Sequence, residues 1–265
     1  MFKTILVTFL FLFSNLVYSK QKDISLIHYN VDENKIVHDE NIHELRPIAS
    51  LTKLMTAMVA LDYDKTLNRE LKLINKVGSS LPYKTYTRKE LFEAMLIRSD
   101  NAAAETIAND FPGGRKMFIL KMNSKAEQIG LKNTSFKDPT GLNRNNISTA
   151  SEVASMVIFA SKYELIKSVS IKKQAAFDTT HKKKPRTIYL NNTNRTILFE
   201  FDNVVMSKTG FTIPAGFCVA MMVEKKTDVI QNHVIVVMGT KNPKERIDVV
   251  KNIMYKEVLP NETRI

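Results

Sequence analysis

The two ends of the chain carry hydrophobic and polar residues in the alternation that is typical of β-strands. Residues 24–29 alternate, a turn-forming segment follows at residues 31–35, and Ile36 and Val37 resume the apolar pattern, which predicts a hairpin. Toward the other end, three apolar runs of strand length occupy residues 204–206, 217–223 and 234–238. The polar segment 224–228 indicates a turn between the last two runs. We therefore expect strands from both ends of the chain.

The middle of the chain has apolar residues at three- and four-residue intervals instead, which is the spacing of amphipathic helices. One helix is expected to begin at Ser50 and another near Asn101. Capping-box patterns at residues 87–90 and 149–152 predict the starts of two more. A further helix is predicted from residue 114 to the terminating Gly130, and a last one at residues 244–258.

This order of elements predicts an α/β (α+β) fold with one antiparallel sheet built from both ends of the chain and flanked by helices. A helical lobe would be inserted between the two sets of strands. We expect a sheet lobe of residues 20–56 and 170–265 and a helical lobe of residues 57–169, within one domain. With 44% hydrophobic residues, the chain can bury a substantial core.

The first 19 residues predict an export signal. Lys3 precedes an apolar run at residues 5–13, and Val17-Tyr18-Ser19 offers a cleavage site before Lys20. The apolar run is short for a membrane span, which favours a cleaved signal over an anchor helix. We therefore expect an exported, periplasmic protein with no transmembrane span after cleavage.

Composition narrows the choice of partners and cofactors. The formal net charge of +12 suits an anionic partner such as a cell-wall polymer or a membrane surface. The basic run 182–186 lacks interleaved aromatic residues, so we expect a solvated loop there and no nucleic acid. Cys218 is the one cysteine and is expected to be buried, and the five histidines show no metal-binding spacing. We predict neither a metal nor another cofactor.

Three short motifs carry the candidate chemistry: Ser50-Leu51-Thr52-Lys53, Ser99-Asp100-Asn101 and Lys208-Thr209-Gly210. A serine hydroxyl needs a nearby base to become a nucleophile, and the i, i+3 spacing places Lys53 on the same helix face as Ser50. Lysine acts as a base only if its pKa falls. We expect the positive end of the helix dipole and the second cation, Lys208, to lower it.

The other two motifs predict the rest of a catalytic site. Ser99 lies at a helix junction, where it can relay a proton to a leaving amine, and Asn101 can hold Lys53 and a substrate amide.

The third motif predicts the substrate-binding strand. Lys208 and Thr209 suit a substrate carboxylate, and Gly210 permits a close approach of the substrate backbone. The backbone N–H of Phe211 is expected to pair with that of Ser50 as an oxyanion hole.

At this point the chain resembles the low-molecular-mass penicillin-binding proteins, the D-alanyl-D-alanine carboxypeptidase family of serine peptidases (family S11). Beyond the three motifs, the similar segments are residues 46–56, 91–101, 122–126, 138–142 and 207–212. The resemblance implies a β-lactamase/transpeptidase-like fold. It also implies attack by Ser50 on a D-alanyl carbonyl of a peptidoglycan stem peptide, an acyl-enzyme, Lys53 as base, and β-lactam antibiotics as covalent inhibitors.

The branch within the family is also suggested by the sequence. Residues 211–265 leave room for two strands and a helix, without the further β-rich domain of many carboxypeptidases. With Ser80-Leu81-Pro82 and Phe111-Pro112-Gly113-Gly114, this is similar to the penicillin-binding protein 7 type D-alanyl-D-alanine endopeptidases. The resemblance therefore favours a cell-wall D,D-endopeptidase over a terminal carboxypeptidase.

Two alternatives remain at this point. A class A β-lactamase shares the three motifs but needs a deacylating glutamate, and residues 138–143 contain no Glu-x-x-Leu-Asn. A non-catalytic wall-binding scaffold is the other, although such proteins usually lose the nucleophile or its base, and this chain keeps both.

Overall fold

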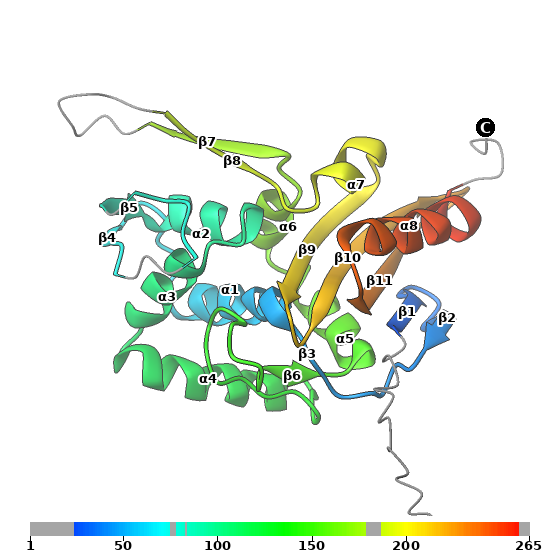
Figure 1. Cartoon of the computed structure of the whole chain (residues 1–265), viewed down its shortest axis with the longest axis horizontal. Helices are drawn as coiled ribbons and strands as arrows, with labels where there is room; N and C mark the ends of the chain where they lie inside the picture. The colour runs from blue at the N-terminus through cyan, green and yellow to red at the C-terminus, as the bar shows by residue number, and fades with distance from the viewer. Residues whose placement is uncertain (1–23, 75–77, 83, 179–186, 260–265) are drawn as a thin grey trace, which may run out of the picture.

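The computed structural model describes residues 24–74, 78–82, 84–178 and 187–259 (Figure 1). The predicted signal at residues 1–19 and the basic run at 182–186 lie outside the described residues. Within the described part of the chain, no helix combines the length and the apolar character that crossing a bilayer requires.

A five-stranded antiparallel sheet confirms that both ends of the chain build one layer. Its order is β2-β1-β11-β10-β9, so the N-terminal hairpin pairs with the C-terminal strands through β1 and β11. The strands are β1 (Ser25–Asn30), β2 (Lys35–Glu40), β9 (Val204–Thr212), β10 (Gly216–Lys226) and β11 (Ile230–Thr240). Three of them extend beyond the apolar runs that predicted them, because strand pairing continues into their polar ends.

The helices are α1 (Thr52–Tyr63), α2 (Arg88–Ile97), α3 (Asn101–Asn109), α4 (Gly114–Gln128), α5 (Ala150–Ala160), α6 (Glu164–Ser170), α7 (Arg195–Glu200) and α8 (Pro243–Ile253). Helices α5 and α8 pack against β10 and β11 of this sheet, and α1 to α4 lie toward the left in Figure 1. Helix α8 continues into a π turn, Met254–Val258. Side chains along β10 and β11 alternate between the two faces of the sheet, so the sheet separates two hydrophobic clusters. Met222 and Val236 belong to the cluster that includes α1 and α5, whereas Met221 and Val237 belong to the cluster that includes α8.

Three short strand pairs lie outside the five-stranded sheet in the described residues. They are β3 (Arg46–Pro47) with β6 (Ile147–Ser148), β4 (Glu70–Lys72) with β5 (Thr85–Thr87), and β7 (Gln174–Asp178) with β8 (Thr187–Asn191). The sequence analysis assigned no element to β7, β8 or α7, because each is short and its apolar positions are few. Helix α1 crosses the predicted boundary between residues 56 and 57, and the division into two lobes stays a prediction.

Two capping boxes were expected, and one is complete. Thr87 caps α2 and Glu90 returns the bond to the Thr87 backbone, as predicted. Thr149 also caps its helix by accepting from the Glu152 N–H. The Glu152 carboxylate, however, accepts from the backbone N–H of Asn133 and from the hydroxyl of Thr134. The second capping box is therefore only half formed, and Glu152 instead fixes the loop that follows α4.

A buried hydrogen-bonded chain joins the sheet to the C-terminal π turn. His28 Nδ1 lies 2.6 Å from Glu257 Oε2, and His28 Nε2 lies 2.9 Å from His233 Nδ1. Because a carboxylate only accepts, His28 carries its proton on Nδ1 and accepts from His233 Nδ1 through Nε2. The remaining His233 Nε2 is buried without a hydrogen-bond partner among the described residues. Burial lowers the pKa of His233 to about 4.

This lowered pKa predicts acid destabilisation. Below pH 6.5 the unfolded chain binds a proton at His233 that the folded chain excludes, so stability present above pH 6.5 is lost as the pH falls toward 4. The loss is expected to reach about 3 kcal/mol. His233→Asn, which keeps a donor for His28, should flatten the unfolding free energy over this range, measured by urea denaturation. The exposed His43→Gln control should retain the wild-type slope, and an equally steep slope in His233→Asn would contradict the assignment.

Candidate active site

Backbone strain and two glycines place Ser50 at the entrance to α1. Ala49 has φ +46°, in the left-handed region that non-glycine residues rarely occupy. A Cβ on Gly141 would lie 1.8 Å from the Ala49 carbonyl oxygen, and a Cβ on Gly210 would lie 3.0 Å from Ser50 N. The turn that carries Ser50 is therefore held between a loop and the edge strand β9, at a closeness that only glycine permits.

Lys53 Nζ lies at the centre of the site, one turn along α1 from Ser50. It is 2.9 Å from Ser50 Oγ, 2.7 Å from Asn101 Oδ1 and 2.7 Å from the Thr140 carbonyl oxygen. These three acceptors suit an ammonium. Without one proton, the same nitrogen keeps two donors and points a lone pair at the Ser50 hydroxyl.

Burial favours the uncharged form of Lys53 that a general base requires. It lowers the pKa of Lys53 to about 7, against the opposing effect of the Asp138 and Asp100 carboxylates. The sequence analysis named the helix dipole and Lys208 as the causes of the shift, whereas burial is the largest cause. Every residue from Thr52 to Leu61 is buried, so the lysine has no solvated face.

The second lysine lies beside the second serine. Lys208 Nζ donates to Ser99 Oγ at 3.0 Å and to the Thr209 carbonyl oxygen at 2.7 Å. Burial lowers the pKa of Lys208 well below its usual value, and the positive charges of Lys53 and Arg246 lower it further. Ser99 has φ +63°, a strained conformation that non-glycine residues rarely adopt.

Asp100 fixes the junction between α2 and α3. One carboxylate oxygen caps α3 by accepting from the Ala103 N–H, and the other accepts from Ser79 Oγ and Ser80 N. The neighbouring Asn101 is held by Lys53 and lies against Gly78, where a Cβ would come 2.4 Å from its amide nitrogen. The motif serves as a helix cap and also orients two side chains into the site.

Asp138 likewise fixes the loop that contains Thr140. Its carboxylate accepts from the backbone N–H groups of Thr140, Gly141 and Asn143. This closed loop directs the Thr140 carbonyl at Lys53. The sequence analysis used the segment for the family resemblance and against a β-lactamase, and it gave Asp138 no function.

The structure gathers all eight predicted site residues around one region, and seven of them are described by the contacts above. The eighth, Phe211, follows Gly210 on β9 with its side chain exposed. A hollow of about 370 Å³ is lined by Ser50, Ser99, Asn101, Leu142, Thr193, Thr209, Gly210, Phe211, Phe217, Pro243 and Arg246. No carboxylate side chain is among these lining residues, and the described residues hold no metal-binding cluster.

Two polar lining residues, Thr193 and Arg246, were missed by sequence reasoning. Thr193 accepts a hydrogen bond from Thr209 Oγ1 at 2.6 Å, and it comes from a segment to which no element was assigned. Arg246 belongs to the predicted last helix, and the sequence analysis gave it no role. It is largely buried and brings a guanidinium to the wall that contains Thr209. Hydroxyls and a guanidinium together suit a carboxylate ligand.

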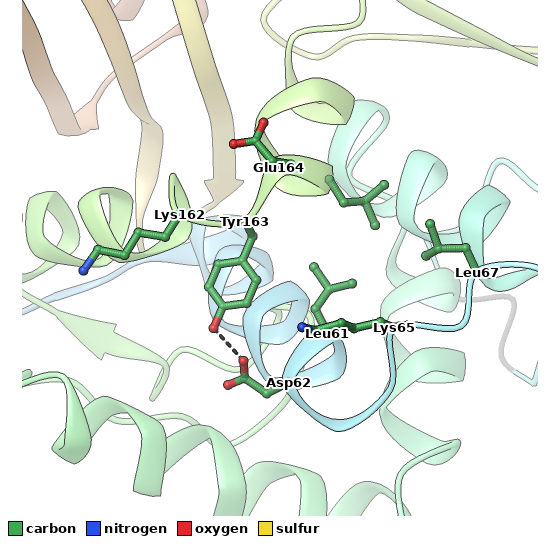
Figure 2. A pocket seen from close by; sticks show the side chains of 8 residues that line it. Leu61, Asp62, Lys65, Leu67, Lys162, Tyr163 and Glu164 are labelled. Atoms are coloured by element: carbon green, nitrogen blue, oxygen red, sulfur yellow. Dashed lines mark hydrogen bonds between the residues drawn. The ribbon is translucent and has the colours of Figure 1, made fainter.

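A second hollow, of about 380 Å³, lies at the other end of α1 (Figure 2). Figure 2 shows Tyr163 directed at Asp62, and its hydroxyl donates to that carboxylate at 2.6 Å. Leu61 in this wall is about 16 Å along the helix from Ser50, and none of the predicted site residues lines the hollow. The candidate chemistry therefore belongs to the Ser50 hollow.

Relatives of known name share most of this chain. Residues 19–242 match the family model described as D-alanyl-D-alanine carboxypeptidase, Peptidase S11. The D-alanyl-D-alanine endopeptidase of Escherichia coli is 36% identical over 200 residues, which cover 72% of this chain and 64% of the relative. The carboxypeptidase DacF of Bacillus subtilis is 35% identical over 233 residues, covering 81% and 57%. The chain thus matches less than two thirds of the length of these relatives.

Solved structures confirm the predicted fold class. A mutant of the Streptomyces K15 DD-transpeptidase superimposes with a TM-score of 0.78 at 23% identity, covering 87% of this chain and 95% of that one. Penicillin-binding protein D2 from Listeria monocytogenes, in its ampicillin-bound form, gives a TM-score of 0.75 at 25% identity, covering 87% and 94%. With a family model matched over most of its length, this chain belongs to the D-alanyl-D-alanine carboxypeptidase family of serine peptidases, S11.

Proposed function

We propose that this chain is a serine D,D-peptidase that opens D-alanyl bonds in peptidoglycan stem peptides through an acyl-enzyme on Ser50. One observation carries the proposal: the fully buried Lys53 amine lies 2.9 Å from the Ser50 hydroxyl, and burial lowers the pKa of Lys53 to about 7. A sizeable fraction of this amine is uncharged at neutral pH, as a general base must be.

Acylation follows from this geometry. Ser50 Oγ attacks the D-alanyl carbonyl carbon and gives its proton to Lys53 Nζ. The oxygen of the tetrahedral intermediate is stabilised by the backbone N–H groups of Ser50 and Phe211, a role supported by the closeness of β9 to Ser50 N. The C–N bond then breaks, and the leaving amine receives, through Ser99, the proton that Lys53 took from Ser50, which leaves Lys53 uncharged again. The Ser99 hydroxyl is held by its hydrogen bond to Lys208.

Deacylation uses the same groups in reverse. Water gives a proton to Lys53, its oxygen attacks the ester carbonyl, and the C–O bond to Ser50 breaks as Ser50 recovers its proton.

The other residues of the hollow position the substrate before acylation. The carboxylate beyond the scissile bond is held by Thr209, Thr193 and Arg246. Asn101 orients Lys53 and the substrate amide.

Cross-linked stems are the proposed substrate. The relatives in Escherichia coli and Pseudomonas aeruginosa, 36% and 34% identical, are named endopeptidases, whereas DacF is named a carboxypeptidase. We propose that the D,D-endopeptidase reaction dominates, in an exported, periplasmic protein at the cell wall. The net charge of +12 suits binding to an anionic cell-wall polymer.

The test is incubation of the purified chain with cross-linked muropeptide dimers and with a free pentapeptide, followed by mass spectrometry. We expect release of monomers from the dimer and slower loss of one alanine from the pentapeptide. Ser50→Ala should abolish both reactions, because Ser50 carries the one hydroxyl that is hydrogen-bonded to Lys53 among the described residues. Activity that survives in Ser50→Ala would contradict the acyl-enzyme, and a wild-type chain that binds muropeptides without cleaving them would support the non-catalytic scaffold.

A β-lactamase is disfavoured by the lining of the hollow. A class A enzyme needs a glutamate to activate the deacylating water, and no carboxylate side chain lines the Ser50 hollow. The Listeria relative has been seen in an ampicillin-bound form. We propose that β-lactams acylate Ser50 here and that the adduct persists.

A further inference from the structure

Three exposed cations belong to segments that meet at Thr193, which lines one wall of the Ser50 hollow. They are Arg98, Lys173 and Arg195. The Thr193 N–H donates to the carbonyl oxygen of Ile97, the residue before Arg98, and the Asn192 N–H donates to the carbonyl oxygen of Lys173. Arg195 follows Thr193 by two residues. The edge of the hollow at Thr193 is therefore basic.

These three cations are not neutralised by neighbouring carboxylates. Within the described residues none of them forms an ion pair, whereas the nearby Lys172 pairs with Glu93 and Lys251 pairs with Glu200, each at 2.6 Å. No carboxylate side chain lines the Ser50 hollow. Uncompensated positive charge at the edge of a cleft attracts an anionic ligand.

Two of the cations lie over an exposed aromatic ring. Lys173 Nζ is 4.5 Å from the centroid of the Phe199 ring, and the guanidinium carbon of Arg195 is 5.0 Å from it. Phe199 is 56% exposed, although Ile197 and Leu198 on the same helix are buried in the core. The ring is thus outside the core, and with its two cations it offers a ligand both an apolar surface and charge.

A second exposed ring precedes this helix on β8, and Figure 1 shows the chain passing from β8 into α7. Tyr189 is 63% exposed and lies on the face of the β7–β8 hairpin opposite the buried Leu190. The same face carries the exposed amides of Gln174 and Asn191, which are cross-strand partners. A ring beside amides suits a sugar, because the ring packs on an apolar pyranose face and amides both donate to and accept from hydroxyls.

The proposed reaction places a particular part of a substrate at this edge. Thr209 and Thr193, joined at 2.6 Å, hold the carboxylate beyond the scissile bond in the proposed mechanism, so the leaving side of the substrate lies here. In a cross-linked substrate the leaving amine belongs to a second stem, and that stem is attached to a second glycan strand. The chain that continues from the leaving amine therefore passes the exposed cations and rings.

We propose that these side chains form an exosite for the glycan strand that carries the leaving stem. They are Arg98, Lys173, Tyr189, Arg195 and Phe199. The rings pack against sugar units, and the cations face the carboxylates of the leaving stem. An anionic membrane surface is the competing occupant, but the amides beside Tyr189 favour sugar hydroxyls, since lipid phosphates only accept. The exosite rests on the proposed function.

The test uses two cross-linked dimers that differ in their sugars: a muropeptide dimer with its disaccharides, and the same peptide dimer without sugars and with its exposed amines acetylated. The wild-type chain should cleave the sugar-bearing dimer with a kcat/KM about tenfold higher, since well-placed aromatic contacts contribute on this scale. Phe199→Ser should lower this preference to about threefold or less and leave cleavage of the sugar-free dimer unchanged. Because Phe199 is more than half exposed, the variant is expected to fold as the wild type does.

Tyr63→Ser is the matched control. Tyr63 is also an exposed ring on a helix, 46% exposed at the far end of α1 from Ser50, so this variant should keep the wild-type preference. An unchanged preference in Phe199→Ser, or an equal loss in Tyr63→Ser, would overturn the exosite. If Phe199→Ser keeps the preference but no longer binds phosphatidylglycerol vesicles, the surface is a lipid contact and the proposal is overturned as well.

The cations are tested separately. Lys173→Gln combined with Arg195→Gln should lower kcat/KM on both dimers by about threefold, as exposed ion pairs contribute on this scale, and leave penicillin labelling unchanged. Unchanged cleavage of both dimers would overturn the role of the cations. A wild-type chain that cleaves both dimers at the same rate would overturn the exosite and keep the proposed function, whereas one that cleaves neither dimer would overturn the proposed endopeptidase function itself.

Discussion

Replacing Lys53 with methionine is expected to slow the acylation of Ser50 by about 10³-fold, because general-base catalysis contributes about 10²–10⁴. Methionine is close to lysine in volume and fills the buried site without a charge, so the fold should persist. The measurement is the second-order rate of labelling by a fluorescent penicillin, with thermal unfolding as the check on structure. Lys125→Met is the control: Lys125 in α4 pairs with Asp62 in α1 and should be dispensable.

The pH dependence of the wild-type rate tests the same amine. The base form of Lys53 is uncharged, and the pKa of Lys53 is about 7. The acylation rate should therefore fall about tenfold per pH unit below 7 and level off above it. A flat profile between pH 5 and 9, or a Lys53→Met chain that reacts at the wild-type rate, would contradict Lys53 as the base.

Replacing Gly141 with alanine is expected to damage both stability and acylation. The added Cβ would lie 1.8 Å from Ala49 O and 2.8 Å from Ser50 N, and Gly141 has φ +88°. Both neighbours are backbone, so the turn that carries Ser50 must move. We expect a loss of about 3 kcal/mol or more in unfolding free energy, from strain and overpacking together. Displacing the Ser50 N–H should slow acylation by about 10²-fold or more.

Gly130→Ala separates the effect of backbone strain from the effect of overpacking. Gly130 has φ +81°, and a Cβ there would meet no atom within 4 Å, so only the left-handed backbone is penalised. This variant should lose about 1–2 kcal/mol and keep its acylation rate. If Gly141→Ala matches Gly130→Ala in urea denaturation and in penicillin labelling, the close packing of Gly141 on the Ser50 turn has no functional role.

Periodicity and local capping made much of the fold predictable. The strands at both ends, the α2 capping box and the helix junction at Ser99 depend on residues near one another in sequence, and the structure confirms them. The short elements β7, β8 and α7 were not predicted, because tertiary packing stabilises them more than their local sequence pattern does.

The residue types of the candidate site were predictable from the sequence, but the cause of the lowered pKa of Lys53 and the contacts made through tertiary structure were not. The motifs identified Ser50 and Lys53, yet the cause of the lowered pKa of Lys53 is burial of the whole of α1, which no tetrapeptide reveals. Arg246 and Thr193 reach the site through tertiary structure. The strained φ of Ala49 depends on the packing of Gly141 and Gly210 around it.

Peptide mapping by mass spectrometry, after incubation of the full chain with ampicillin, tests the central claim most directly. A covalent adduct is predicted on Ser50 alone, at one per chain, and none is predicted on the Ser50→Ala variant. An adduct on another residue, or equal labelling of Ser50→Ala, would contradict a nucleophile made reactive by the buried amine of Lys53.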